Sequence, residues 1–98
     1  MTSFGNPDEV LSIGRKLTAE ELKRALRLSI ADEYEAVHVY TLIAEAVEDE
    51  KFRAVIMDIV REEQVHASQF WDLLARIDPS ESEAYERAVK ENKELMGK

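Results

Sequence analysis

Three residues of this chain have the types and the spacing of metal ligands. Glu63 and His66 lie three residues apart, so a helix would present both side chains on one face. Glu33 lies thirty residues upstream, and all three stand where the helical pattern is otherwise hydrophobic. An ionised carboxylate is costly to bury without a partner or a metal. Carboxylate oxygens with an imidazole nitrogen suit iron, manganese or zinc, and in a helical bundle this set most indicates iron.

These residues make up half of a known type of site. A carboxylate-bridged di-iron centre in a helical bundle takes one Glu from each of two helices and a Glu-x-x-His pair from each of two others. This chain contains one of each. Two copies of the chain would complete the set, with two iron ions per dimer, at an isologous two-fold interface.

Each of these residues also has an ordinary structural interpretation. A lone Glu could face solvent at a loosely packed end, and a lone His66 is more often a hydrogen-bonded histidine than a ligand. The metal interpretation therefore depends on the combination. Tyr40, seven residues after Glu33 on the same stripe, could hydrogen-bond a ligand carboxylate or could be an ordinary core residue.

Other polar residues lie beside the candidate ligands. We interpret His38, which is off the hydrophobic stripe, as a solvent-facing histidine, with a surface metal contact as the alternative. Asp32, Glu35 and Glu62 face away from the stripe. They could gather incoming cations, or they could form a merely solvated acidic face.

Two long helices are predicted to position these residues. The first is predicted over 18–48, because Thr18 and Glu21 have the spacing of a capping box and the span contains no internal Gly or Pro. The second is predicted over 50–77, where Asp78-Pro79 ends it.

Each predicted helix carries a heptad seam with steps of four and three. The first seam comprises Leu26, Ile30, Glu33, Val37, Tyr40, Ala44 and Val47. The second comprises Phe52, Ile56, Ile59, Glu63, His66, Phe70, Leu73 and Ile77. The short connection near residue 49 predicts an antiparallel hairpin. Glu33 lies about 16 residues before this connection and Glu63 about 14 after it, so both are predicted at nearly the same height.

The remaining segments flank this hairpin. Residues 1–17 lack periodicity, and we expect a mobile N-terminal segment with a short helical turn at 8–13. A third, short helix is predicted over 81–96, started by a Ser80–Glu83 capping box and followed by Gly97 as its C-cap. The fold class is therefore all-α. The chain divides into the N-terminal segment 1–17 and a helical part, the hairpin with the third helix, over 18–98.

Composition limits the partners of this chain. Its 98 residues suggest one domain, and a chain this short often gains from oligomerisation. The net charge of −8 argues against nucleic acid and against an anionic membrane surface as partners. There is no cysteine, hence no thiolate ligand, which fits a cytoplasmic protein. No apolar run approaches the ~20 residues of a membrane span, and residues 1–7 have no signal-peptide pattern.

The segments 32–40 and 62–67 resemble the encapsulated ferritins, which are short ferritin-like proteins, related to rubrerythrins, packaged in encapsulin shells. The resemblance covers about 18–80. It implies a hairpin that dimerises to rebuild a four-helix ferritin-like bundle, and homodimers that assemble into a ring, commonly a decamer.

The resemblance also implies an activity. Two Fe(II) ions at the dimer two-fold would be oxidised by dioxygen, and Fe(III) would pass into an encapsulin nanocompartment in the cytoplasm for storage. Glu33, Glu63 and His66 match the ligands of that family, and Tyr40 matches its nearby tyrosine. Asp32 and Glu35 match outer acidic positions through which iron enters.

The chain also departs from that family. Val39 stands where relatives often have an aromatic residue, His38 stands where Asp or Asn is expected, and no clear shell-targeting peptide precedes Lys98. Two other functions remain open on the residues alone. One is a rubrerythrin-like di-iron peroxidase, and the other is a metal-free helical assembly module.

Overall fold

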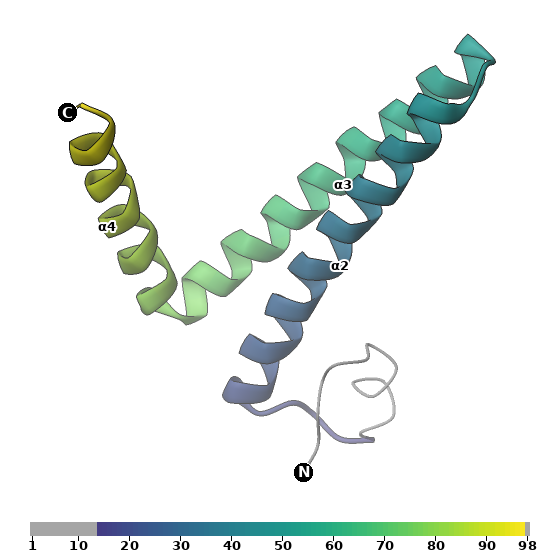
Figure 1. Cartoon of the computed structure of the whole chain (residues 1–98). Coiled ribbons are helices and arrows are strands. Elements are labelled where there is room, and N and C mark those ends of the chain that lie inside the picture. The colour runs from purple at the N-terminus through teal and green to yellow at the C-terminus, as the bar shows by residue number, and fades with distance from the viewer. Residues whose placement is uncertain (1–13, 98) are drawn as a thin grey trace.

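A computed structural model describes residues 14–97, which contain three α-helices (Figure 1). The helices are α2 (Ala19–Ala46), α3 (Glu50–Ile77) and α4 (Pro79–Met96). The predicted all-α fold is confirmed: α2 and α3 form an antiparallel hairpin, and α4 leaves the far end of α3 at a wide angle (Figure 1). The helical turn predicted at 8–13 lies outside the described residues.

The start of α2 follows the predicted capping box. The Thr18 hydroxyl accepts from the Glu21 N–H at 3.2 Å, and the Glu21 carboxylate accepts from the Thr18 N–H at 2.9 Å. Arg15 adds two hydrogen bonds to the same carboxylate, at 2.7 and 2.8 Å. The Arg15 hydrogen bond, followed by that from the Thr18 N–H, lowers the pKa of Glu21 to about 2. This end of the hairpin is therefore well defined.

α2 is about two residues shorter at its C-terminal end than predicted, so the connection to α3, residues 47–49, is longer. α2 ends at Ala46 instead of about residue 48, because Val47 is extended and Asp49 serves the next helix. The Asp49 carboxylate caps α3 by accepting from the N–H groups of Lys51 and Phe52 at 2.8 and 3.1 Å. The predicted span of α3, 50–77, is confirmed.

The prediction for the start of α4 is wrong. Asp78, instead of Ser80, is the N-cap, and Pro79 occupies the first turn. The Asp78 carboxylate accepts from the Ser80 N–H at 3.2 Å and from its hydroxyl at 2.6 Å. A proline that ends one helix can equally begin the next, since its missing N–H is not needed there. The predicted C-cap at Gly97 is confirmed.

The core of the hairpin is a narrow stripe between α2 and α3. Its buried members are Leu26, Ala44, Val60, Ala67 and Leu74. The predicted α2 seam lies in this contact, since all of its members are buried or half-buried. The predicted α3 seam lies partly outside it: Phe52 is 65% exposed and Leu73 is 50% exposed. The stripe of α3 that faces α2 is offset by one residue, because α3 has adjacent apolar stripes and only one can face α2.

The described part of the chain is extended for its length. Its radius of gyration is 17.3 Å, whereas a compact domain of 100 residues has about 13 Å. Its extents are 50 × 46 × 21 Å, and Figure 1 shows why: the hairpin and α4 form a flat V whose arms diverge. Much apolar surface therefore stays exposed in the single chain. None of the helices in the described range is long and apolar enough to cross a membrane.

Candidate metal centre

The hairpin brings the three candidate ligands together. Glu33 comes from the middle of α2, and Glu63 and His66 come from the middle of α3. One ligand atom of each residue lies within 4.8 Å of the other two. The Nδ1 atom of His66 is 3.7 Å from Glu33 Oε2 and 3.6 Å from Glu63 Oε2. The equal height predicted for Glu33 and Glu63 by counting from the connection is confirmed.

His66 lies close to both carboxylates without a hydrogen bond to either. The two distances from His66 exceed the range of an N–H···O hydrogen bond. The Oε2 atom of Glu33 is buried and has no hydrogen-bond partner among residues 14–97. Buried carboxylate oxygens are seldom left without a partner. Two carboxylates and an imidazole around a shared space form a donor set that fits a divalent cation such as iron.

The electrostatics of the cluster favour a positive charge. The Glu63 carboxyl, close enough to share a proton with Glu33, raises the pKa of Glu33, and burial raises it further. The charge of His66 opposes this shift. Repulsion between two adjacent carboxylates is relieved when either a proton or a metal ion binds between them. When neither a proton nor a metal ion is bound, the two carboxylates repel each other and this repulsion destabilises the cluster.

The raised pKa of Glu33 predicts that the stability of the metal-free protein depends on pH. A carboxyl group whose pKa is raised on folding contributes stability that is present at low pH and is lost as pH rises through its raised pKa. With a chelator present to remove metal, the melting temperature of the wild-type protein should fall as the pH rises above the usual pKa range of carboxyl groups. Glu33→Gln should weaken this fall, whereas Glu35→Gln, at an exposed carboxylate nearby, should not. Thermal denaturation by circular dichroism across pH checks this. A Glu33→Gln curve parallel to wild type would contradict it.

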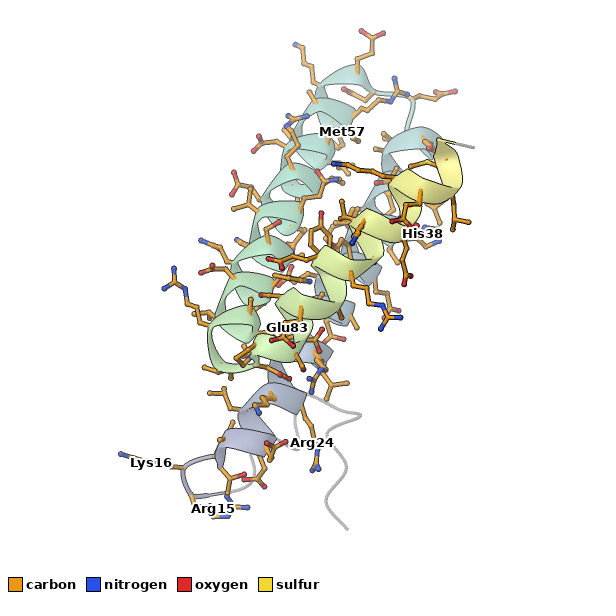
Figure 2. The ribbon with its side chains drawn as sticks, turned by 90° about the vertical axis from the view of Figure 1, so that its left-hand side faces the viewer. Arg15, Lys16, Arg24, His38, Met57 and Glu83 are labelled. Carbon is orange, nitrogen blue, oxygen red and sulfur yellow. The ribbon has the colours of Figure 1, made fainter. Side chains whose placement is uncertain are left out.

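The other predicted site residues lie around the cluster. Tyr40 is half-buried on the α2 stripe, but it does not donate to Glu33 Oε2, which has no partner in the described chain. Its contribution to the site stays a prediction. Asp32 and Glu35 are exposed on α2. His38 is exposed as predicted (Figure 2).

A groove of about 620 Å³ opens beside the cluster. Its lining consists of Glu33, His66, Gln69, Phe70, Asp72 and Leu73. Gln69 and Asp72 were not predicted from the sequence, because both look like ordinary solvent-facing positions of α3. The groove and the exposed His66 place the cluster on an open side of the hairpin, not in its interior.

Comparisons with known proteins identify one matching family and two similar sequences. The sequence model of the family described as Rubrerythrin matches residues 24–97. The chain is 36% identical over 78 residues to the encapsulin nanocompartment cargo protein EncC of Myxococcus xanthus. It is 39% identical over 80 residues to a ferritin-like-encapsulin shell fusion protein of Pyrococcus furiosus. These matches cover 80% and 82% of the chain, but only 60% and 23% of the relatives' own lengths.

A solved structure is also similar. The crystal structure of an encapsulated ferritin domain from Pyrococcus furiosus superposes with a TM-score of 0.84 and 35% sequence identity. The similarity covers 95% of this chain and 94% of that chain. The likeness therefore extends over α2, α3 and α4.

Proposed function

Since this chain belongs to the rubrerythrin family of ferritin-like proteins, we propose that it is a ferroxidase. Its substrates are Fe(II) and dioxygen, and its site is a di-iron centre shared between two copies of the chain. The observation that carries this proposal is the convergence of Glu33, Glu63 and His66 around an unsatisfied carboxylate oxygen on the open side of the hairpin.

The ligand count supports a shared site. One chain supplies two carboxylates and one imidazole, which is half the set found in carboxylate-bridged di-iron bundles. A two-fold axis through the cluster would supply four carboxylates and two imidazoles. A pair of antiparallel hairpins side by side also has four helices, as the bundle requires.

The surface around the cluster supports the same arrangement. On α3 the exposed residues Phe52, Ile59 and Leu73 lie on the side that also carries Glu63 and His66. We call this the site face. Apolar side chains of this size are each worth about 1.5–3 kcal/mol when they are buried. Docking a second site face against the first would bury them and enclose the ligands at once.

The residues of the cluster have simple roles in this proposal. Glu33, Glu63 and His66 hold the Fe(II) ions, and the two carboxylates bind them without a proton, so binding releases protons at low pH. Two Fe(II) ions give one electron each to dioxygen, which with two protons becomes hydrogen peroxide. In this proposal Tyr40 supports a ligand carboxylate, and Asp32 and Glu35 attract arriving cations.

We further propose that the protein is cargo of an encapsulin compartment. The support is the similarity to an encapsulin cargo protein and to a ferritin-like-encapsulin shell fusion protein. In this proposal the dimers form a decameric ring inside a cytoplasmic encapsulin nanocompartment, and Fe(III) is stored in its lumen.

Family membership also favours a second function, a di-iron peroxidase. These 98 residues contain no cysteine, so they do not themselves supply the thiolate ligands of an electron-delivering iron site.

Native mass spectrometry of the metal-free protein, before and after anaerobic Fe(II) addition, tests the shared site. We expect dimers or larger rings that take up two iron ions per pair of chains, because each chain supplies one half of the ligands. Glu45→Ala, at an exposed carboxylate of α2, is the matched control and should take up the same amount. A monomer, or an oligomer without stoichiometric iron, would favour the metal-free assembly module instead.

A further inference from the structure

One arginine joins the two long helices beside their connection. Arg53, in the first turn of α3, reaches back to the end of α2. Its Nε donates to the carbonyl oxygen of Ala44 at 2.9 Å, and a second guanidinium nitrogen donates to the carbonyl oxygen of Val47. The last carbonyl groups of a helix have no partner within the helix. Arg53 therefore satisfies the end of α2 with hydrogen bonds that come from α3.

The position of Arg53 in the helix contact is unusual for a charged residue. It stands seven residues before Val60 and continues the buried stripe formed by Val60, Ala67 and Leu74. Apolar contacts are non-directional, so these three residues allow α2 to slide or rotate by a small amount. Hydrogen bonds have narrow limits of distance and angle. A single polar residue in an apolar helix contact is a known means of fixing register.

The spacing connects this fixed point to the metal centre. Ala44 lies 11 residues after Glu33, and Glu63 lies 10 residues after Arg53. At a rise of 1.5 Å per residue, both distances are about 15–17 Å along the helix axes. Joining Ala44 to Arg53 therefore brings Glu33 level with Glu63. A slip of one residue would move a ligand by about 1.5 Å along the axis and turn it by about 100° around it.

The opposite end of the hairpin is tied differently. Arg27 of α2 pairs with Asp78 at 2.7 Å and with Glu81 at 2.9 Å. Its partners are side chains, which adjust their rotamers when a helix shifts, and Arg27 itself is about half exposed. The partners of Arg53 are backbone atoms of Ala44 in α2 and of its C-cap Val47, which move with the end of the helix. The hydrogen bonds of Arg53, more than the ion pairs of Arg27, therefore determine the register of α2 against α3.

We propose that Arg53 is a positioning residue for the metal centre, which holds Glu33 opposite Glu63 and His66 before a second chain or a metal binds. This inference rests on the proposed function, because it assumes that the three residues bind a divalent metal. It goes beyond that function by assigning the geometry of the site to a residue that is far from the metal and contacts none of the ligands.

The test compares two variants in their binding of Co(II), a spectroscopic substitute for Fe(II). Arg53→Met keeps the apolar stem of the side chain and removes its donors. Leu74→Ala removes buried packing from the same stripe, at the other end of α3, and leaves the connection intact. Both are titrated with Co(II) at concentrations where sedimentation shows the wild-type oligomer, and visible spectra report the geometry around the metal.

We expect Arg53→Met to bind Co(II) about tenfold more weakly with an altered visible spectrum, as is typical when support for metal ligands is lost. Leu74→Ala should keep the wild-type spectrum and nearly the wild-type affinity, although its melting temperature falls. Arg53→Lys, which retains one charged donor, should recover part of the affinity. The inference is overturned if Arg53→Met binds like wild type, or if Leu74→Ala loses as much. If wild type binds no Co(II), the proposed function fails first, and this inference falls with it.

Discussion

Glu63→Ala is expected to lower the initial rate of Fe(II) oxidation by more than about 100-fold, since changes to groups that merely support metal ligands already cost 10–100-fold. Glu63 lies with Glu33 and His66 in the only cluster of potential metal ligands in residues 14–97. By symmetry, one substitution removes two carboxylates from each shared site. Stopped-flow absorbance of Fe(III) after mixing with aerated buffer measures the rate.

The fold of this variant should survive, which makes the loss of activity specific. Removing the Glu63 carboxyl also removes the hydrogen bond, and with it the charge, that raise the pKa of Glu33, so the metal-free protein should melt no lower than wild type. Glu45→Ala, with the same change in net charge at an exposed position, should retain most of the rate. A Glu63→Ala protein that oxidises Fe(II) at the wild-type rate would remove Glu63 from the site. Replacing dioxygen by hydrogen peroxide in the same assay separates a ferroxidase from a peroxidase.

Leu73→Lys is expected to separate the two chains and, with them, the two halves of the metal centre. Leu73 lies on the site face and is 50% exposed in the single chain. If two site faces dock, each dimer would bury two unpaired ammonium groups, at a cost of several kcal/mol. Each 1.4 kcal/mol is a tenfold change in affinity, so the dissociation constant of the dimer should rise by more than about 100-fold. Sedimentation velocity and iron content per chain measure both effects.

Val65→Lys is the matched control for this prediction. Val65 is on the same helix and is 53% exposed, but it points away from the side that carries Glu63 and His66. The same charge there should leave the dimer and its iron content unchanged. A Leu73→Lys protein that remains dimeric and still takes up two iron ions per pair of chains would show that another surface joins the chains.

Local signals were enough to place the main elements. The Thr18–Glu21 capping box and the acidic break before Glu50 located the starts of α2 and α3, because helix ends are decided by side chains within a few residues. The hairpin followed from the short connection. Similar residue counts on both sides of that connection, about 16 and about 14, then placed Glu33 opposite Glu63 and His66. This part of the candidate site could be predicted because it depends on fixed helix geometry.

Other features depend on contacts that the sequence pattern leaves open. The pattern of α3 contains two adjacent apolar stripes, and hydrophobicity alone does not decide which one faces α2. Asp78-Pro79 can end α3 or begin α4, and here it does both. Arg53 looks like an ordinary charged residue, because its partners are backbone carbonyls that appear in no side-chain pattern. The wide angle of α4 has no local signal either.

If each chain carries half of a metal centre on an open face, the chemistry also depends on the amount of protein. When each chain holds half of the ligands, the number of complete sites follows mass action. In dilute solution that number rises with the square of the chain's concentration. A compartment that confines many copies in a small volume would keep the sites assembled, whereas copies that escape from it would come apart. The geometry of Glu33, Glu63 and His66 would thus restrict iron oxidation to the place where the protein is concentrated.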